Sequence, residues 1–247
     1  MPGSGQAVEI PHQKAPLAGR LHRPRQGPVR ALVVVAHGLQ SSMQSEKLTR
    51  LARELAAAGY AALRFDHTGC GDSPGDPYAV TLSGRRDELL SAADFLARQV
   101  SEDLPRVYMG SSLGGTAAAL AAAVAPPAVV VAWSAPWDLP AIMARLRHDP
   151  EVARLTALAR DMARYDLSRI LPRLSGLLVV HGGQDEVVPV EQARLAHRLA
   201  APPKDLLVLP GADHRLSRPE HQEQATAHTL AWIGRRLEKA GWRRGPG

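Results

Sequence analysis

The sequence predicts an α/β fold in which a mostly parallel sheet is covered by helices on both faces. Short, continuously apolar runs alternate along most of the chain with longer segments that carry the apolar period of a helix. Because these runs are apolar throughout, they indicate strands buried on both sides, as in parallel sheets. With 247 residues and no recognisable linker, we expect one domain over residues 1–247.

The first half of the chain begins with a segment that differs from the rest. Residues 6–24 alternate loosely and contain three prolines, which is typical of edge strands or a hairpin. The elements expected after it are a strand at 31–36, a helix at about 44–58, a strand at 61–65, a helix at about 84–100 and a strand at 106–109. This order describes βαβ units.

The second half repeats the alternation with one interruption. The expected elements are a helix at about 116–125, a strand at 128–132, helical pieces at about 139–147 and 151–165, a strand at 177–180, a helix at about 190–199, a strand at 206–209 and a helix at about 219–238. The two adjacent helical pieces break the strand–helix rhythm, so we interpret residues of about 134–173 as a small helical cap insertion. The tail at 241–247 is expected to be frayed.

The pentapeptide Gly110-Ser111-Ser112-Leu113-Gly114 lies between a predicted strand and an alanine-rich predicted helix. A Gly-x-Ser-x-Gly sequence in this context is typical of a nucleophile elbow, a sharp turn that holds a serine hydroxyl above the sheet. The alternative is a serine that only caps the helix. The context favours Ser112 as a candidate nucleophile.

Polar side chains follow several of the predicted strands. The positions are His37-Gly38-Leu39, Asp66, Ser112, Trp133-Ser134, Asp185 and Pro210-Gly211-Ala212-Asp213-His214. Because ligands bind at the carboxyl ends of the strands in open parallel sheets, these positions are the candidates for a functional site.

With serine, aspartate and histidine in this chain order, the sequence resembles the α/β-hydrolase superfamily over residues of about 30–235, and within it the compact capped esterases. The resemblance implies that Ser112 is the nucleophile, His214 the general base and Asp185 the carboxylate that orients the imidazole. It also implies an oxyanion hole formed by the backbone N–H groups of Leu39 and Leu113.

Several other residues compete for these roles. Glu186 and Asp138 are alternative acids, whereas Asp213 is expected to point away from the neighbouring His214. The loop from Asp66 to Ser73 is interpreted as structural, and Cys70 within it as a bystander. His221 and His228 lack a metal-site pattern, which favours a solvated helix face, and we expect no metal or cofactor.

Apolar residues near the predicted site are candidates for an acyl pocket, with ordinary core packing as the alternative. They are Leu39, Met43, Trp133, Trp137, Met143 and Met162. A cap of about forty residues predicts a modest pocket rather than a long lipid-binding trench.

Composition narrows the possible partners and location. The net charge is +6, but the basic residues are scattered and lack accompanying aromatics, which argues against nucleic-acid binding. No signal-peptide pattern and no membrane-length apolar run occur, and the single Cys70 fits a reducing compartment. We expect a soluble cytoplasmic protein that binds a small-molecule ester and no membrane. The sequence does not indicate an oligomeric state.

The resulting functional hypothesis is a serine hydrolase that cleaves small carboxylic esters through an acyl-enzyme intermediate. The alternatives are a peptidase or amidase similar to the prolyl-oligopeptidase type, a thioesterase, and a catalytically silent binding protein on the same fold. The intact serine, aspartate and histidine argue against the silent protein.

Overall fold

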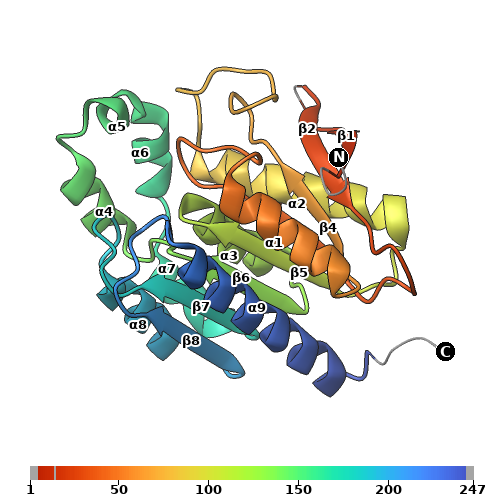
Figure 1. Ribbon diagram of the computed structural model, residues 1–247. Helices are drawn as coiled ribbons and strands as arrows, with labels where there is room; N and C mark the ends of the chain where they lie inside the picture. Colours follow the sequence, from red (N-terminus) through yellow and green to blue (C-terminus); the bar gives the residue numbers. More distant parts are fainter. Residues whose placement is uncertain (1–4, 14, 243–247) are drawn as a thin grey trace.

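A single sheet runs through the computed structural model, which describes residues 5–13 and 15–242 (Figure 1). Its strands are β1 (Gln6–Ile10), β2 (Leu17–His22), β3 (Leu32–Ala36), β4 (Ala61–Phe65), β5 (Arg106–Ser111), β6 (Val129–Trp133), β7 (Leu177–Gly182) and β8 (Lys204–Leu209). The helices are α1 (Glu46–Ala57), α2 (Leu82–Val100), α3 (Leu113–Val124), α4 (Leu139–Leu146), α5 (Pro150–Arg154), α6 (Thr156–Met162), α7 (Leu167–Ile170), the 3-10 helix η1 (Leu171–Arg173), α8 (Val190–Leu199) and α9 (Pro219–Lys239).

The strands are arranged in the order β1-β2-β4-β3-β5-β6-β7-β8. The segment with several prolines forms the predicted edge hairpin, in which β1 and β2 are antiparallel, and β2 is also antiparallel to β4. From β4 to β8 all neighbouring strands are parallel. The predicted fold class is therefore confirmed, and the carboxyl ends of six parallel strands lie along one edge.

Strand β3 illustrates why its sequence is apolar throughout. Leu32, Val34 and Ala36 pack into a core shared with α2, α3 and α8, whereas Val33 and Val35 face the opposite side, where α1 and α9 lie. Successive side chains of a strand point to opposite faces, so a strand with helices on both sides needs apolar residues at every position.

Small residues let α3 lie close to the sheet. All residues from Leu113 to Ala122 are buried. A Cβ atom on Gly114 would lie 2.5 Å from the carbonyl oxygen of Ala36, at the end of β3. The glycine therefore allows the start of α3 to approach the end of β3, which brings Ser112 next to the loop that follows β3.

The segment between β6 and β7 folds as α4–α7 and η1, beside the carboxyl ends of the strands (Figure 1). One detail of the prediction for this segment is wrong, because the second helical piece is broken at Leu155. Its φ and ψ of −83° and 52° lie outside the helical region. Its N–H donates to the carbonyl oxygen of Val152 in α5, and its carbonyl oxygen accepts from the N–H of Ala159 in α6. The apolar residues of this piece, Val152, Leu155, Leu158 and Met162, are nevertheless buried, so the helical spacing of apolar residues continues across a turn that it did not reveal.

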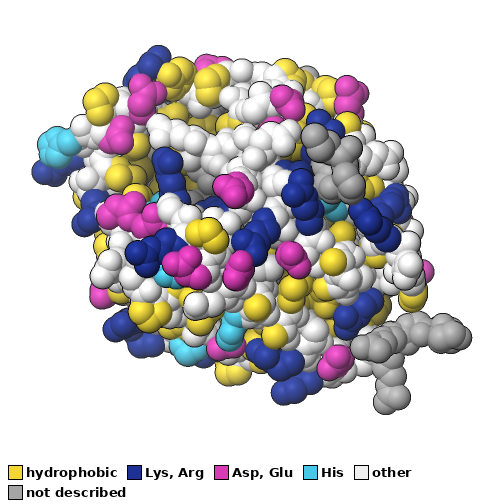
Figure 2. Space-filling model, in the orientation of Figure 1, with side chains coloured by type: hydrophobic (Ala, Val, Ile, Leu, Met, Phe, Trp, Pro, Cys, Tyr) yellow, Lys and Arg dark blue, Asp and Glu magenta, His cyan; other side chains and the backbone are white. Residues whose placement is uncertain are grey.

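The surface carries charges of both signs. Figure 2 shows Lys and Arg side chains interspersed with Asp and Glu over the visible face. Within residues 5–13 and 15–242, no helix has the length and apolar character needed to span a bilayer. The tail predicted to fray lies mostly outside the described residues, which end at Trp242 after α9.

Candidate active site

The turn between β5 and α3 holds Ser112 in a strained backbone conformation. Its φ of 54° and ψ of −128° are rarely adopted by residues with a side chain. The Ser112 N–H donates to the carbonyl oxygen of Trp133 at 2.7 Å, which ties the turn to β6. Gly110 leaves room for it, since a Cβ there would collide with the backbone of Gly114. The backbone is thus the one that a nucleophile elbow requires.

Ser112 and two side chains from distant parts of the sequence form a continuous row of hydrogen-bonded groups. The Oγ of Ser112 lies 3.1 Å from Nε2 of His214, and Nδ1 of His214 lies 2.8 Å and 3.0 Å from the two carboxylate oxygens of Asp185. These are hydrogen-bond distances. The structure therefore brings together the three residues whose positions the sequence singled out.

Several hydrogen-bond donors surround the carboxylate of Asp185 and stabilise its charged form. Its Oδ1 accepts hydrogen bonds from the N–H groups of Val187 and Val188, at 3.0 and 2.7 Å. On the other oxygen, Nε2 of His181 approaches to 3.2 Å beside Nδ1 of His214. Burial alone would raise the pKa of Asp185, but the hydrogen bonds from His181 and His214 outweigh it and hold the pKa far below its usual range.

Backbone contacts fix the Asp185 loop against the turn that carries His214. The N–H of Gln184 donates to Ala212 O at 2.9 Å, and the N–H of Gly183 donates to Leu209 O at 2.8 Å. A side chain at Gly182 would collide with the Ala212 carbonyl. The glycines at the end of β7 therefore permit the close approach that sets the distance between acid and imidazole.

The two predicted oxyanion-hole residues lie beside the serine. Leu113 is the first residue of α3, where N–H groups have no intrahelical acceptor. Leu39 follows β3, and both leucines line the same small cavity as Ser112. Gly38 keeps this loop close, since a Cβ there would lie 3.0 Å from Cβ of Ser112.

Comparison with known proteins shows the family to which the chain belongs. Residues 27–175, more than half of the chain, match the model of the serine aminopeptidase S33 family. The chain belongs to this family of α/β hydrolases. The uncharacterized protein Rv2307c of Mycobacterium tuberculosis is 30% identical over 186 residues, which cover 70% of this chain and 58% of that protein. The chain therefore spans little more than half of that relative.

Further relatives include enzymes. Rat mitochondrial palmitoyl-protein thioesterase ABHD10 is 24% identical over 227 residues, which cover 80% of this chain and 72% of ABHD10. Est1E from Butyrivibrio proteoclasticus with bound ferulic acid is 22% identical, with a TM-score of 0.79 over 94% and 100% of the two chains. An esterase domain from Rhodothermus marinus is 26% identical, with a TM-score of 0.74 over 93% and 98%. These structures share the α/β-hydrolase fold.

An apolar cavity of about 50 Å³ opens next to Ser112. Besides Ser112 it is lined by Leu39, Leu113, Ile142, Met143, Leu146, Val152, Leu158, Met162, Val187 and Val188. Six of these residues come from α4, α5 and α6, and hydrophobic side chains are visible below α5 and α6 in Figure 2. Within the described residues, the lining contains no carboxylate.

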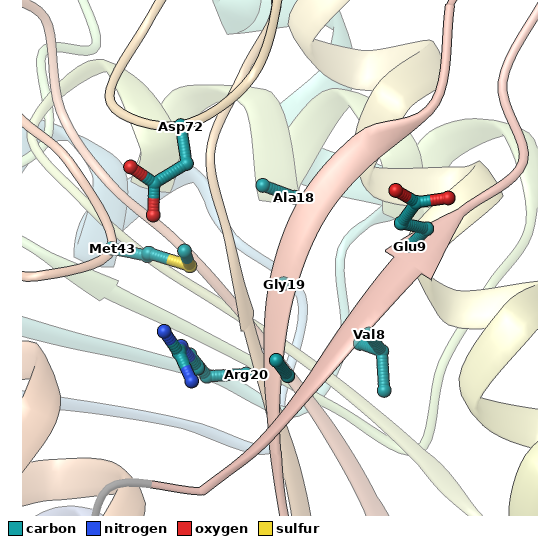
Figure 3. A pocket seen from close by; sticks show the side chains of 8 residues that line it. Val8, Glu9, Ala18, Gly19, Arg20, Met43 and Asp72 are labelled. Carbon is teal, nitrogen blue, oxygen red and sulfur yellow. The ribbon is translucent and has the colours of Figure 1, made fainter.

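Three predicted pocket residues lie elsewhere in the structure. Met43 borders a different depression, beside β1 and β2, together with Arg20 and Asp72 (Figure 3). Trp133 belongs to the core on the α1 and α9 side, where its indole N–H donates to Thr229 Oγ1 at 3.1 Å. Trp137 is 2% exposed and packs into the opposite core. These three predictions are wrong because strand ends and loops direct large apolar residues into the core as readily as into a pocket. Met143, by contrast, lines the cavity.

The alternative acids have other contacts. Asp138 caps α4 by accepting from the N–H of Ala141, and Glu186 accepts from the backbone N–H of His214 at 3.1 Å. Asp213 accepts hydrogen bonds from the N–H and hydroxyl of Ser217, so its carboxylate is engaged away from the ring of His214. Asp185 is thus the acid in contact with the His214 side chain.

The remaining candidate groups have structural contacts. Asp66 accepts from the backbone N–H groups of Met43 and Asp72, which shapes its loop as expected. His228 pairs with Asp205 at 2.9 Å, whereas His221 is buried, so the expectation that it lies on a solvated helix face is wrong. Among the residues that the structure describes, no group of His, Cys, Asp or Glu side chains is arranged to hold a metal ion.

Two polar residues of the site were not singled out from the sequence. His181 is the residue before the last of β7 and contacts Asp185, and its signal in the sequence is the stretch His181-Gly182-Gly183-Gln184-Asp185 that leads to the acid. Arg85 lies in α2 and reaches the loop after β3. It had no sequence signal, because an arginine in a predicted helix is usually solvated.

Proposed function

We propose that this protein is a serine hydrolase that cleaves small carboxylic esters through an acyl-enzyme intermediate. The observation that carries the proposal is the continuous row from Ser112 through His214 to the buried carboxylate of Asp185. A serine hydroxyl becomes a useful nucleophile when a neighbouring base takes its proton, and an imidazole can both take and return a proton near neutral pH.

In the first half of the reaction, the Ser112 Oγ attacks the ester carbonyl carbon while its proton passes to Nε2 of His214. The carbonyl oxygen becomes an oxyanion, which the N–H groups of Leu39 and Leu113 stabilise. Collapse of this intermediate expels the alcohol, which takes the proton from His214. A water molecule then gives its proton to His214 and attacks the acyl-enzyme, releasing the acid and restoring Ser112.

The cavity supports a small, uncharged acyl group. Its volume of about 50 Å³ is far below the roughly 300 Å³ at which pockets for drug-sized ligands begin. An aminopeptidase must bind a substrate ammonium group, for which a carboxylate is the usual partner, yet the cavity lining among the described residues is apolar apart from Ser112. This favours an esterase over the aminopeptidase activity in the family's name. We propose that the segment of about 134–173 acts as the cap that shapes this cavity, in a cytoplasmic enzyme.

The test is to offer three substrate series to the wild type and to Ser112→Ala. The series are p-nitrophenyl esters of increasing acyl length, peptide p-nitroanilides, and acyl thioesters, the last prompted by the likeness to ABHD10. We expect Ser112-dependent turnover that is highest for short esters. Turnover of anilides alone would replace the proposal with a peptidase, and preferred turnover of thioesters would replace it with a thioesterase. Failure of folded wild type to react with a fluorophosphonate would indicate a silent binding protein.

A further inference from the structure

A buried arginine donates hydrogen bonds to the loop that follows β3. Arg85, on α2, is 1% exposed, and its Nη1 lies 3.1 Å from the carbonyl oxygen of His37 and 3.2 Å from that of Gly38. The N-terminal part of α2 thus lies behind the loop that carries Leu39.

The Gly38 carbonyl also has a second donor. Nε2 of His37 accepts from the N–H of His67 at 3.1 Å, so the proton of the neutral ring is on Nδ1, which lies 2.8 Å from Gly38 O. Burial holds the pKa of His37 well below its usual value, in agreement with a neutral ring. Gly38 O therefore accepts from an imidazole and a guanidinium and is directed into the protein.

The direction of this carbonyl determines the direction of the next N–H. The Gly38–Leu39 peptide is planar and trans, so its N–H is antiparallel to its C=O. Because the carbonyl of Gly38 is directed at Arg85, the N–H of Leu39 points to the other side, where Leu39 and Ser112 share the cavity.

Burial lowers the pKa of Arg85, and the nearby charge of Glu88 only partly offsets this effect. Among the described residues, no carboxylate lies within ion-pair distance of its guanidinium, since Glu88 pairs with His67. Within residues 5–13 and 15–242, its Nε has no hydrogen-bond partner, and its Nη2 lies 3.8 Å from the sulfur of Cys70. An incompletely paired buried charge is unfavourable for stability, which points to a role beyond packing.

We infer that Arg85 is a positioning residue for the oxyanion hole: it fixes the Gly38–Leu39 peptide so that the Leu39 N–H is directed at the oxygen of the tetrahedral intermediate. The guanidinium lies at the carbonyl end of the peptide dipole and the oxyanion would lie at the N–H end. The positive charge therefore polarises the peptide in the direction that stabilises the oxyanion. This inference rests on the proposed serine hydrolase function.

The test compares Arg85→Met and Arg85→Lys with a matched control, Arg86→Met. Arg86 is the next residue of α2, but its guanidinium contacts Asp87 and Tyr165 rather than the loop after β3. The first readout is the second-order rate of labelling by a fluorophosphonate, in which Ser112 displaces fluoride from phosphorus while the phosphoryl oxygen occupies the oxyanion hole. The second readout is kcat and KM for p-nitrophenyl acetate per labelled active site, with folding monitored by circular dichroism.

We expect Arg85→Met to lower kcat and the labelling rate by roughly 10- to 100-fold, less than the 10²- to 10³-fold typical of deleting an oxyanion donor, with little change in KM. Arg85→Lys should fall between Arg85→Met and the wild type, and Arg86→Met should match the wild type. If Arg85→Met does not fold, the rates of Arg85→Lys decide, and rates equal to those of the wild type would overturn the inference. Folded Arg85→Met with an unchanged rate per active site would do the same. A wild type that does not react at Ser112 would instead refute the proposed function, and this inference with it.

Discussion

Replacing the carboxylate of Asp185 with an amide should leave the fold intact and remove nearly all activity. Oδ1 of Asp185 accepts from two backbone N–H groups, so in Asp185→Asn the amide oxygen should stay at that position. The NH₂ group then takes the place of Oδ2, which lies 2.8 Å from Nδ1 of His214. An NH₂ group cannot accept a hydrogen bond, and Oδ1, 3.0 Å from Nδ1, already accepts from the two backbone N–H groups. We therefore expect the ring to present an unprotonated Nδ1 to the NH₂ group and to carry its proton on Nε2, facing Ser112. Such a ring cannot accept the hydroxyl proton.

The expected decrease in kcat follows from this wrong tautomer of His214. The equivalent change in a serine protease lowers kcat about 10⁴-fold, which corresponds to roughly 5 kcal/mol of transition-state stabilisation. We expect a similar loss here, measured as kcat for p-nitrophenyl acetate. The control is Glu186→Gln, which alters the neighbouring carboxylate that accepts a hydrogen bond from the backbone N–H of His214 rather than from its ring. Glu186→Gln should stay within about tenfold of the wild type, in contrast to the full loss expected from a wrong tautomer. A folded Asp185→Asn variant with activity near that of the wild type would refute the assigned role.

Three further predictions concern the pocket, the elbow and a buried histidine. Met162→Ala should enlarge the cavity and raise the relative kcat/KM for butyrate over acetate esters by about tenfold, the lower end of what one or two methylenes contribute. Met43→Ala, equally buried but outside the cavity, should leave that ratio unchanged, and an equal shift in both variants would contradict the pocket assignment. Ser112→Gly should be more stable than Ser112→Ala by about 1 kcal/mol in urea unfolding, because glycine tolerates the positive φ; equal stabilities would contradict the strain. Burial, together with Arg64 and other arginines, lowers the pKa of His22 to about 4, so the unfolded chain binds more protons between pH 6.5 and 4. His22 should therefore contribute stability that is complete above pH 6.5 and lost as the pH falls to 4, and urea midpoints of His22→Gln should fall less over this range than those of the wild type; parallel curves would disprove it.

Much of the fold could be predicted because the residue types of a strand match the environment that surrounds this strand in the folded protein. A strand such as Leu32–Ala36, apolar at every position, has few alternatives to the centre of a parallel sheet. The end of such a strand also locates functional groups, which is why Ser112, Asp185 and His214 could be selected before their distances were known. The break at Leu155 could not be predicted, since a turn that keeps the apolar spacing leaves the periodic pattern intact.

The parts of the site that could not be predicted from the sequence depend on the direction in which a side chain points in the folded protein rather than on residue type. Trp133 and Met143 are both apolar residues close to strand ends or the cap, but only the structure shows that one faces α9 and the other the cavity. Arg85 is similar: nothing in its helical neighbourhood distinguishes it from the exposed arginines. Its contact with Gly38 arises from the packing of α2 against β3.

The most direct test of the account is to find where the acyl group is held. Wild-type protein is mixed with p-nitrophenyl acetate, quenched in acid during turnover, digested, and analysed by mass spectrometry. We predict that a single acetyl group is found on the peptide that contains Ser112, and that it is absent from Ser112→Ala. Acetyl on a different residue, or ester turnover that Ser112→Ala leaves unchanged, would contradict the central claim.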